Sequence, residues 1–174
     1  MLITITGKSG TGKTTLENYL SEVLETYTSA VSHTTRPKRD AEVDGVDYYF
    51  RNTLEGVKTV EQATYGGNEY ALSYGEAQGD KIVVVTKEGL KQLEEVMDGA
   101  VYRILVTAGP FKTFMRLVRR DGIKNAIKRV CTDIQINNMD GQKYDLILDN
   151  TKDGLDKHKL NVLIFGINKE AIRC

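Results

Sequence analysis

The chain has 174 residues, 40% of them hydrophobic and 28% charged, which is typical of a globular domain that buries a core without disulfides or metals. Its 24 Lys and Arg balance its 24 Asp and Glu, whereas proteins that coat nucleic-acid duplexes usually carry a basic excess. Cys131 and Cys174 form no CxxC or metal-ligand spacing, and no apolar run reaches membrane-spanning length. We therefore expect a cytoplasmic monomer or homodimer, with neither a nucleic-acid nor a membrane partner.

The most informative segment is the N-terminal one, residues 2–15. A predicted strand over 2–6 runs into the sequence GKSGTGKTT, a complete G-x-x-x-x-G-K-[ST] phosphate-binding loop, and a predicted helix follows it. The glycines allow a tight turn that brings backbone N–H groups to phosphate oxygens, and the following helix directs its positive end at the same anion. Lys13 can reach the terminal phosphates, and the Thr14 hydroxyl can hold Mg²⁺. The pattern predicts a nucleoside-triphosphate site formed by Gly7, Ser9, Gly10, Thr11, Gly12, Lys13, Thr14 and Thr15, which by itself fits a kinase, a GTPase switch, a motor or a helicase.

Strands and helices alternate along the rest of the chain. Helical spacing of apolar residues predicts a helix over 14–27, and a short apolar stretch predicts a strand end at 30–32. Residues 33–80 are polar and rich in Gly and Tyr, which indicates a small inserted lobe. The remaining predictions are strands over 81–86, 101–107 and 144–148, and helices over 87–97, 111–120 and 125–138. Leu160–Ile167 fits either a helix that begins near 155 or a strand.

This alternation predicts an α/β fold, in which a parallel sheet carries helices on both faces and ligands bind at the carboxyl ends of the strands. We expect one domain. Its core would be 1–32 and 81–174, its lobe about 33–80, and a short lid about 116–129.

Residues 32–50 contain a second anion-binding pattern. Arg36 and Arg39 lie three residues apart and precede Tyr48, which makes a compact clamp because arginine binds phosphate bidentately. The alternative is a solvated turn rich in Arg and Lys. The sequence, SHTTRPKR and then EVDGVDYYF, resembles the nucleotide-monophosphate lobe of guanylate kinases, whose members carry V-S-x-T-T-R-x-x-R followed by G-E-V-x-G-x-D-Y-x-F.

The resemblance covers about residues 2–150 and implies roles for several residues. Contacts to the acceptor phosphate map onto Arg36, Arg39, Tyr48 and Tyr70, and contacts to guanine map onto Ser32 and Glu61. A glutamate suits guanine because its two oxygens can accept from N1–H and the N2 amine together. The Glu61 match depends on its nine-residue distance from Tyr70; a lone glutamate is more often a surface residue.

The segment 116–129 resembles the family's lid, although the stretch between its arginines is shorter than usual. In the family, such arginines close over the triphosphate, supply positive charge to the phosphoryl group and exclude water. Among Arg116, Arg119, Arg120 and Arg129, the pair Arg120 and Arg129 is best placed; the alternative is a solvated helix face. Asn150 follows the predicted strand over 144–148 and matches the asparagine beside the adenine of ATP.

Two departures affect the base site. The family's L-D-x-D-x-Q-G strand corresponds to VVVTKEG at residues 83–89, so both aspartates are absent and Thr86 replaces the base-reading one. The family's Y-G-[ST] is Tyr70-Ala71-Leu72 here, with Ser73 one residue on. We therefore expect fewer protein contacts to the base and relaxed or altered base selectivity. Mg²⁺ would be held by Thr14, water and the phosphates.

The resemblance implies an ATP- and Mg²⁺-dependent kinase that converts GMP or dGMP to the diphosphate, with Lys13, Arg120 and Arg129 acting on the transferred phosphoryl group. Three alternatives remain. A kinase for another nucleotide or a phosphorylated sugar is favoured by the missing aspartates. A non-catalytic binding module is disfavoured by the intact loop. A GTPase switch is disfavoured because Asn168-Lys169-Glu170-Ala171 lacks the aspartate of the N-K-x-D motif.

Overall fold

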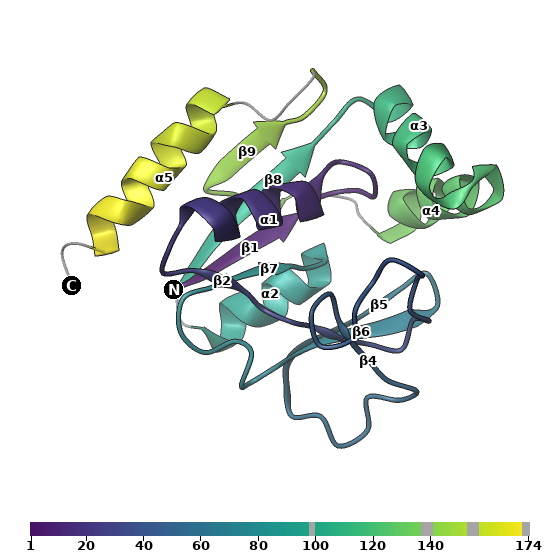
Figure 1. Ribbon diagram of the computed structural model, residues 1–174, viewed down its shortest axis with the longest axis horizontal. Coiled ribbons are helices and arrows are strands. Elements are labelled where there is room, and N and C mark those ends of the chain that lie inside the picture. The colour runs from purple at the N-terminus through teal and green to yellow at the C-terminus, as the bar shows by residue number, and fades with distance from the viewer. Residues whose placement is uncertain (98–99, 137–140, 153–156, 172–174) are drawn as a thin grey trace.

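A computed structural model describes the chain except for residues 98–99, 137–140, 153–156 and 172–174. Its centre is a five-stranded sheet in the order β2-β7-β1-β8-β9 (Figure 1), and every pairing in it is parallel. The strands are β1 (Leu2–Thr6), β2 (Thr28–Ser29), β7 (Lys81–Val84), β8 (Val101–Thr107) and β9 (Leu146–Asp149). Because the strands are parallel, the loops that follow them meet at one edge of the sheet.

Helices cover both faces of this sheet. On one face lie α1 (Lys13–Val23) and α5 (Lys157–Ala171), and on the other lies α2 (Lys87–Val96). Helices α3 (Pro110–Asp121) and α4 (Ile123–Ile136) pack on each other beyond the ends of the strands (Figure 1). Successive strand residues point to opposite faces. Accordingly, Ile3 packs in one cluster with residues of α1 and α5, while its neighbour Leu2 packs in another with residues of α2. The predicted α/β fold, with a parallel sheet between helices, is confirmed.

A second, four-stranded sheet is inserted between β2 and β7 in the order β4-β3-β6-β5. Its strands are β3 (His33–Thr34), β4 (Tyr49–Phe50), β5 (Thr59–Tyr65) and β6 (Asn68–Ser73). Val60 and Leu72 of this sheet share a core cluster with Leu90 and Leu93 of α2, so the small sheet packs against the central one through that helix. The division into core, lobe and lid stays a proposal.

Some predicted boundaries are wrong. Helix α1 ends at Val23 and not at 27, although Leu24 and Tyr27 are buried in the same core, which explains why the apolar pattern continues past the helix. The strand end predicted at 30–32 is wrong, because β2 ends at Ser29; only the amide of Ala30 still pairs with the sheet, at 2.8 Å from the carbonyl oxygen of Ile82.

The ambiguous tail is helical. Leu160, Leu163 and Ile167, spaced three and four residues apart, bury one face of α5 against the sheet. The segment Asn168–Ala171 lies within this helix. Within the part of the chain that the structure describes, no helix is both long and apolar enough to cross a membrane.

Candidate active site

The phosphate-binding loop joins β1 to α1 at the carboxyl edge of the sheet. Gly10 and Gly12 have φ angles of 78° and 103°, a region that L side chains rarely adopt. A Cβ atom on Gly12 would lie 2.5 Å from the Asn150 side-chain nitrogen, and one on Gly10 would lie 2.8 Å from the carbonyl oxygen of Thr113. The loop is therefore closely backed by α3 and by the residue after β9, and glycine is required at both positions.

Lys13 lies folded over this loop. Its Nζ donates to the carbonyl oxygens of Gly7 at 2.8 Å and Lys8 at 3.0 Å. Burial lowers the pKa of Lys13 to about 8; the nearby Asp133 carboxylate opposes this shift, while Arg120 and Arg129 add to it. At pH 7 the ammonium is still mainly charged, and carbonyl oxygens hold it where phosphate oxygens would bind.

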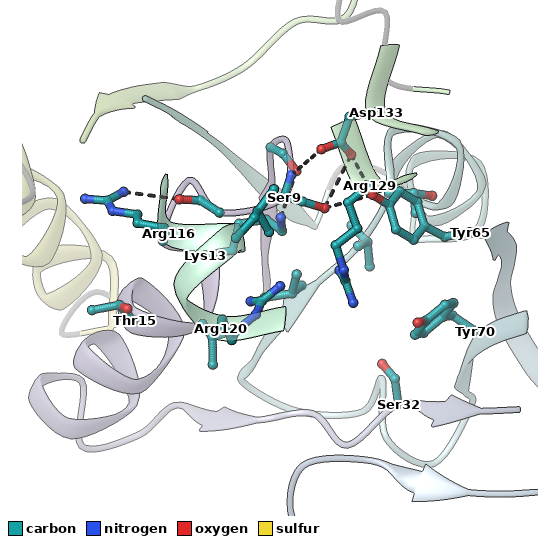
Figure 2. A pocket seen from close by; sticks show the side chains of 18 of the residues that line it. Ser9, Lys13, Thr15, Ser32, Tyr65, Tyr70, Arg116, Arg120, Arg129 and Asp133 are labelled. Atoms are coloured by element: carbon teal, nitrogen blue, oxygen red, sulfur yellow. Dashed lines mark hydrogen bonds between the residues drawn. The ribbon is translucent and has the colours of Figure 1, made fainter. Parts of the chain in front are cut away.

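A cavity of about 570 Å³ opens beside the loop (Figure 2), within the range of roughly 300–1,000 Å³ typical of small-molecule sites. It brings together residues that lie far apart along the chain. Those predicted from the sequence are Gly7, Ser9, Gly10, Gly12, Lys13, Thr14, Thr15, Ser32, Arg36, Arg39, Tyr48, Glu61, Tyr70, Thr86, Arg120, Arg129 and Asn150.

One predicted loop residue does not line this cavity. Thr11 is buried, and its hydroxyl donates to the carbonyl oxygen of Lys8 at 2.9 Å. Its own carbonyl accepts from the side chain of Asn150 at 2.8 Å, so Asn150 braces the loop from the end of β9.

Arg36 and Arg39 are held by one carboxylate, that of Glu42. Arg36 donates to both oxygens of Glu42 at 2.9 and 2.8 Å, and Arg39 donates through its amide at 2.8 Å and its guanidinium at 3.1 Å. Burial acts to raise the pKa of Glu42, but these hydrogen bonds outweigh it and lower that pKa. Arg36 also lies over the rings of Tyr48 and Phe50, 5.3 and 5.5 Å from their centroids. Glu42 thus fixes both cations at the cavity wall.

Tyr48 completes this cluster as a hydrogen-bond donor. Burial raises the pKa of its hydroxyl to about 12, and the nearby Tyr70 and Glu17 add to the shift. The rings of Tyr48 and Tyr70 meet edge to face, with centroids 6.0 Å apart. Two phenols and two guanidinium groups therefore face one part of the cavity, as an anion requires.

Glu61 and Thr86 flank a single glycine at the start of α2. Glu61 is only 4% exposed, and burial raises its pKa to about 7; the amide of Leu72 opposes this shift, and Glu88 adds to it. A Cβ atom on Gly89 would collide with the Glu61 carboxylate. Thr86 is the N-cap of α2, and its hydroxyl accepts from the Gly89 amide at 3.0 Å. The only side-chain oxygen of Thr86 is thus already engaged in capping the helix.

Asp121 organises the lid arginines at the junction of α3 and α4. It forms ion pairs with Arg120 at 2.8 Å and with Arg129 at 3.0 Å, and hydrogen bonds from Arg120 help to lower its pKa against the opposing effect of burial. Arg119 is exposed and does not line the cavity. Arg120 and Arg129, the pair singled out from the sequence, therefore line the cavity, whereas Arg119 does not.

Sequence reasoning assigned no role to two polar residues of the cavity wall, Tyr65 and Asp133, and it named Arg116 only as one of the four arginines of the segment 116–129. Arg116 donates to the carbonyl oxygen of Gly10 at 3.2 Å. Asp133 accepts from the amide of Ser9 at 2.8 Å and from the hydroxyl of Tyr65 at 2.7 Å. The signal for Asp133 was its position: it is the sole acidic residue in 122–136 and follows Arg129 by one helical turn. No sequence feature distinguishes Tyr65 from the other tyrosines.

The donor set for a metal is small. Within the described part of the chain, no three His, Cys, Asp or Glu residues converge on a possible metal position. Mg²⁺ usually keeps several waters and binds substrate phosphates, with few protein ligands. The Thr14 hydroxyl at the cavity wall fits such a cation, and the neighbouring Val84 and Val85 offer it no ligand.

Comparisons with known proteins identify the family and the fold. The guanylate kinase family model matches residues 1–162, which span the chain from β1 into α5. The fold is similar to that in the crystal structure of guanylate kinase from Anaplasma phagocytophilum, with a TM-score of 0.61 and 19% sequence identity. The likeness covers 97% of this chain and 85% of that one. At this identity, the structural likeness concerns the fold.

Proposed function

The chain belongs to the guanylate kinase family, and from that premise we propose that it transfers the γ-phosphoryl group of ATP to GMP or dGMP. The products would be ADP and GDP or dGDP. The observation that carries this proposal is one cavity lined both by the phosphate-binding loop and by the cluster of Arg36, Arg39, Tyr48 and Tyr70. A cavity with two anion-binding regions suits a reaction between two phosphorylated molecules.

At the donor region, the loop amides and Lys13 would hold the β- and γ-phosphates of ATP. Mg²⁺, when bound with Thr14 as its protein ligand, would neutralise charge on these phosphates. Arg120 and Arg129 would stabilise the charge on the phosphoryl group as it moves. Phosphoryl transfer depends on positioning and charge neutralisation, so the residues seen here suffice without a protein nucleophile. Asn150, which braces the loop, is proposed to lie beside the adenine.

At the acceptor region, Arg36 and Arg39, held in place by Glu42, would bind the monophosphate, and the hydroxyl groups of Tyr48 and Tyr70 would donate to it. Ser32 and Glu61 would bind guanine. Thr86 lies next to Glu61, but one lone pair of its hydroxyl oxygen accepts from the Gly89 amide to cap α2, so this hydroxyl cannot accept from two guanine donors as a carboxylate can. Guanine would therefore be recognised mainly through Glu61.

The second candidate is a kinase of the same scaffold for another nucleoside monophosphate or a phosphorylated small molecule. The apolar Val84 and Val85 at the cavity wall, together with the capping role of Thr86, favour it, because they leave little polar surface to select a base. The non-catalytic module is disfavoured by Lys13, which is half-buried and held on the intact loop.

Product analysis tests the proposal directly. Incubation with ATP, Mg²⁺ and GMP should give equal amounts of ADP and GDP, and omission of either nucleotide should give neither. ADP without GDP would indicate ATP hydrolysis and contradict the kinase assignment.

Replacing Arg39 with alanine should weaken binding of the acceptor nucleotide but not binding of ATP. Loss of one charge-assisted bidentate contact typically costs about 2–3 kcal/mol; because the Arg39 side chain is 39% exposed, we expect the lower value, roughly a 30-fold loss of kcat/KM for the acceptor. The KM for ATP should stay within twofold, and Arg51→Ala, at an exposed arginine of the same lobe, serves as control. Equal weakening of ATP and acceptor would contradict the assignment of two separate regions.

The ionisation of Glu61 predicts a pH dependence. The ionised carboxylate is the form that accepts both guanine donors, so binding should depress its pKa below the free value of about 7. The affinity for GMP should then be highest above pH 7. Below pH 7 it should fall by up to about tenfold for each pH unit. Titration calorimetry between pH 5.5 and 8.5 measures this slope. The Glu61→Gln variant should show only the slope due to the phosphate of GMP itself; an identical slope in both proteins would contradict the prediction.

A further inference from the structure

Three residues from distant parts of the chain meet at one end of the cavity: Ser9 of the phosphate loop, Tyr65 at the end of β5 and Asp133 in α4 (Figure 2). We call them the Asp133 junction. Asp133 is 4% exposed, and both of its carboxylate oxygens accept hydrogen bonds. Oδ2 accepts from the Ser9 amide at 2.8 Å, and Oδ1 accepts from the Tyr65 hydroxyl at 2.7 Å. The Ser9 and Tyr65 hydroxyls are themselves 2.8 Å apart.

The junction ties α4 to the phosphate loop and to β5. Arg129 precedes Asp133 by four residues, and residues at this spacing lie one above the other on the same face of a helix. Both line the cavity. Arg129 is otherwise held by Asp121, which lies at the opposite end of α4 from the junction. Hydrogen bonds that seat Asp133 on the loop and on β5 therefore also determine where the Arg129 guanidinium reaches.

We propose that Asp133 is a positioning residue for the transfer reaction: its carboxylate docks α4 onto the phosphate loop and β5, so that Arg129 faces the phosphoryl group. This inference rests on the proposed function. The role is geometric, because a negative charge near the loop would by itself repel phosphate. An asparagine at this position can still accept from the Ser9 amide and can donate its N–H to the Tyr65 hydroxyl, so it can keep the contacts without the charge.

The experiment compares Asp133→Ala, Asp133→Asn, Tyr65→Phe and the Ala/Phe double variant, with Ile134→Ala, at a 68%-exposed neighbour on α4, as control. We expect the alanine variant to lower kcat about 10- to 50-fold and to raise the Kd for Mg·ATP about tenfold, because displacement of a catalytic group by an ångström is enough for such losses. The KM for the acceptor should stay within twofold. Asparagine should restore most of the lost activity. The double variant should lose little more than alanine alone, since both changes break one network.

Two results would overturn the inference. An asparagine variant as impaired as the alanine variant would show that the charge matters and not the contacts. An alanine variant with unchanged or higher kcat, or with tighter ATP binding, would show that Asp133 competes with phosphate or has no role. If alanine prevents folding, Tyr65→Phe and Asp133→Asn carry the same test. If the unmodified protein phosphorylates no nucleoside monophosphate, the proposed function fails, while the Kd values for Mg·ATP still decide whether the junction positions α4.

Discussion

Replacing Lys13 with alanine is expected to lower kcat by about 10²–10³ or more, the loss typical when a charge that stabilises the transition state is removed from a water-excluded site. Its Nζ lies against the carbonyl oxygens of Gly7 and Lys8, inside the loop that would hold the triphosphate. Burial already disfavours the charged ammonium, as its lowered pKa shows, so alanine should not reduce the thermal stability of the fold. Steady-state kinetics and a thermal melt measure both effects.

Lys8 provides a matched control. It is a lysine of the same loop, but its side chain is exposed and does not line the cavity. Lys8→Ala should therefore keep kcat within about twofold, as expected for a surface substitution. A folded Lys13→Ala protein with near-normal turnover would mean that the loop is not the catalytic site.

The second large effect concerns the choice of base. Glu61→Gln should reduce the preference for GMP over AMP by about 100-fold, because hydrogen bonds to a charged group contribute about 1.5–3 kcal/mol each and the amide offers one acceptor in place of two. A site that holds a buried carboxylate for paired donors rejects a base that lacks them. The ratio of kcat/KM for the two nucleotides is the quantity to measure.

Stability should not confound that experiment, because a neutral glutamine is cheaper to bury than an ionised glutamate. Glu55→Gln, at an exposed position of the same lobe, is the control and should leave the ratio unchanged. A ratio that is the same in Glu61→Gln and in the unmodified protein would remove Glu61 from base recognition.

Local features of the sequence were predicted well. The phosphate loop could be predicted because its geometry depends on glycines at fixed spacing, and the observed positive φ angles at Gly10 and Gly12 explain why the pattern needs them. Helices and buried strands were predicted because periodicity reports which side of an element is buried. The prediction of a strand end at 30–32 failed because an apolar residue can be buried beyond the end of a strand; Ala30 is buried and keeps one hydrogen bond to Ile82, but β2 ends at Ser29.

Contacts between distant segments could not be predicted in the same way. The Asp133 junction joins residues that are 56, 68 and 124 positions apart, and no local pattern encodes such a meeting. Glu42 was visible in the lobe motif, but its bidentate hold on Arg36 depends on the folded turn. Thr86 was considered only as a replacement for a base-reading aspartate, although a threonine directly before a helix is also a common N-cap.

The most direct test of the central claim is an assay of ADP release from Mg·ATP with each of the eight common ribo- and deoxyribonucleoside monophosphates as acceptor. The proposed function predicts the highest kcat/KM with GMP or dGMP, a lower value with AMP and little turnover with pyrimidine nucleotides. A preference for AMP or for a pyrimidine monophosphate would contradict guanylate specificity but would still support a nucleoside-monophosphate kinase. No turnover with any of the eight would contradict the nucleoside-monophosphate kinase itself.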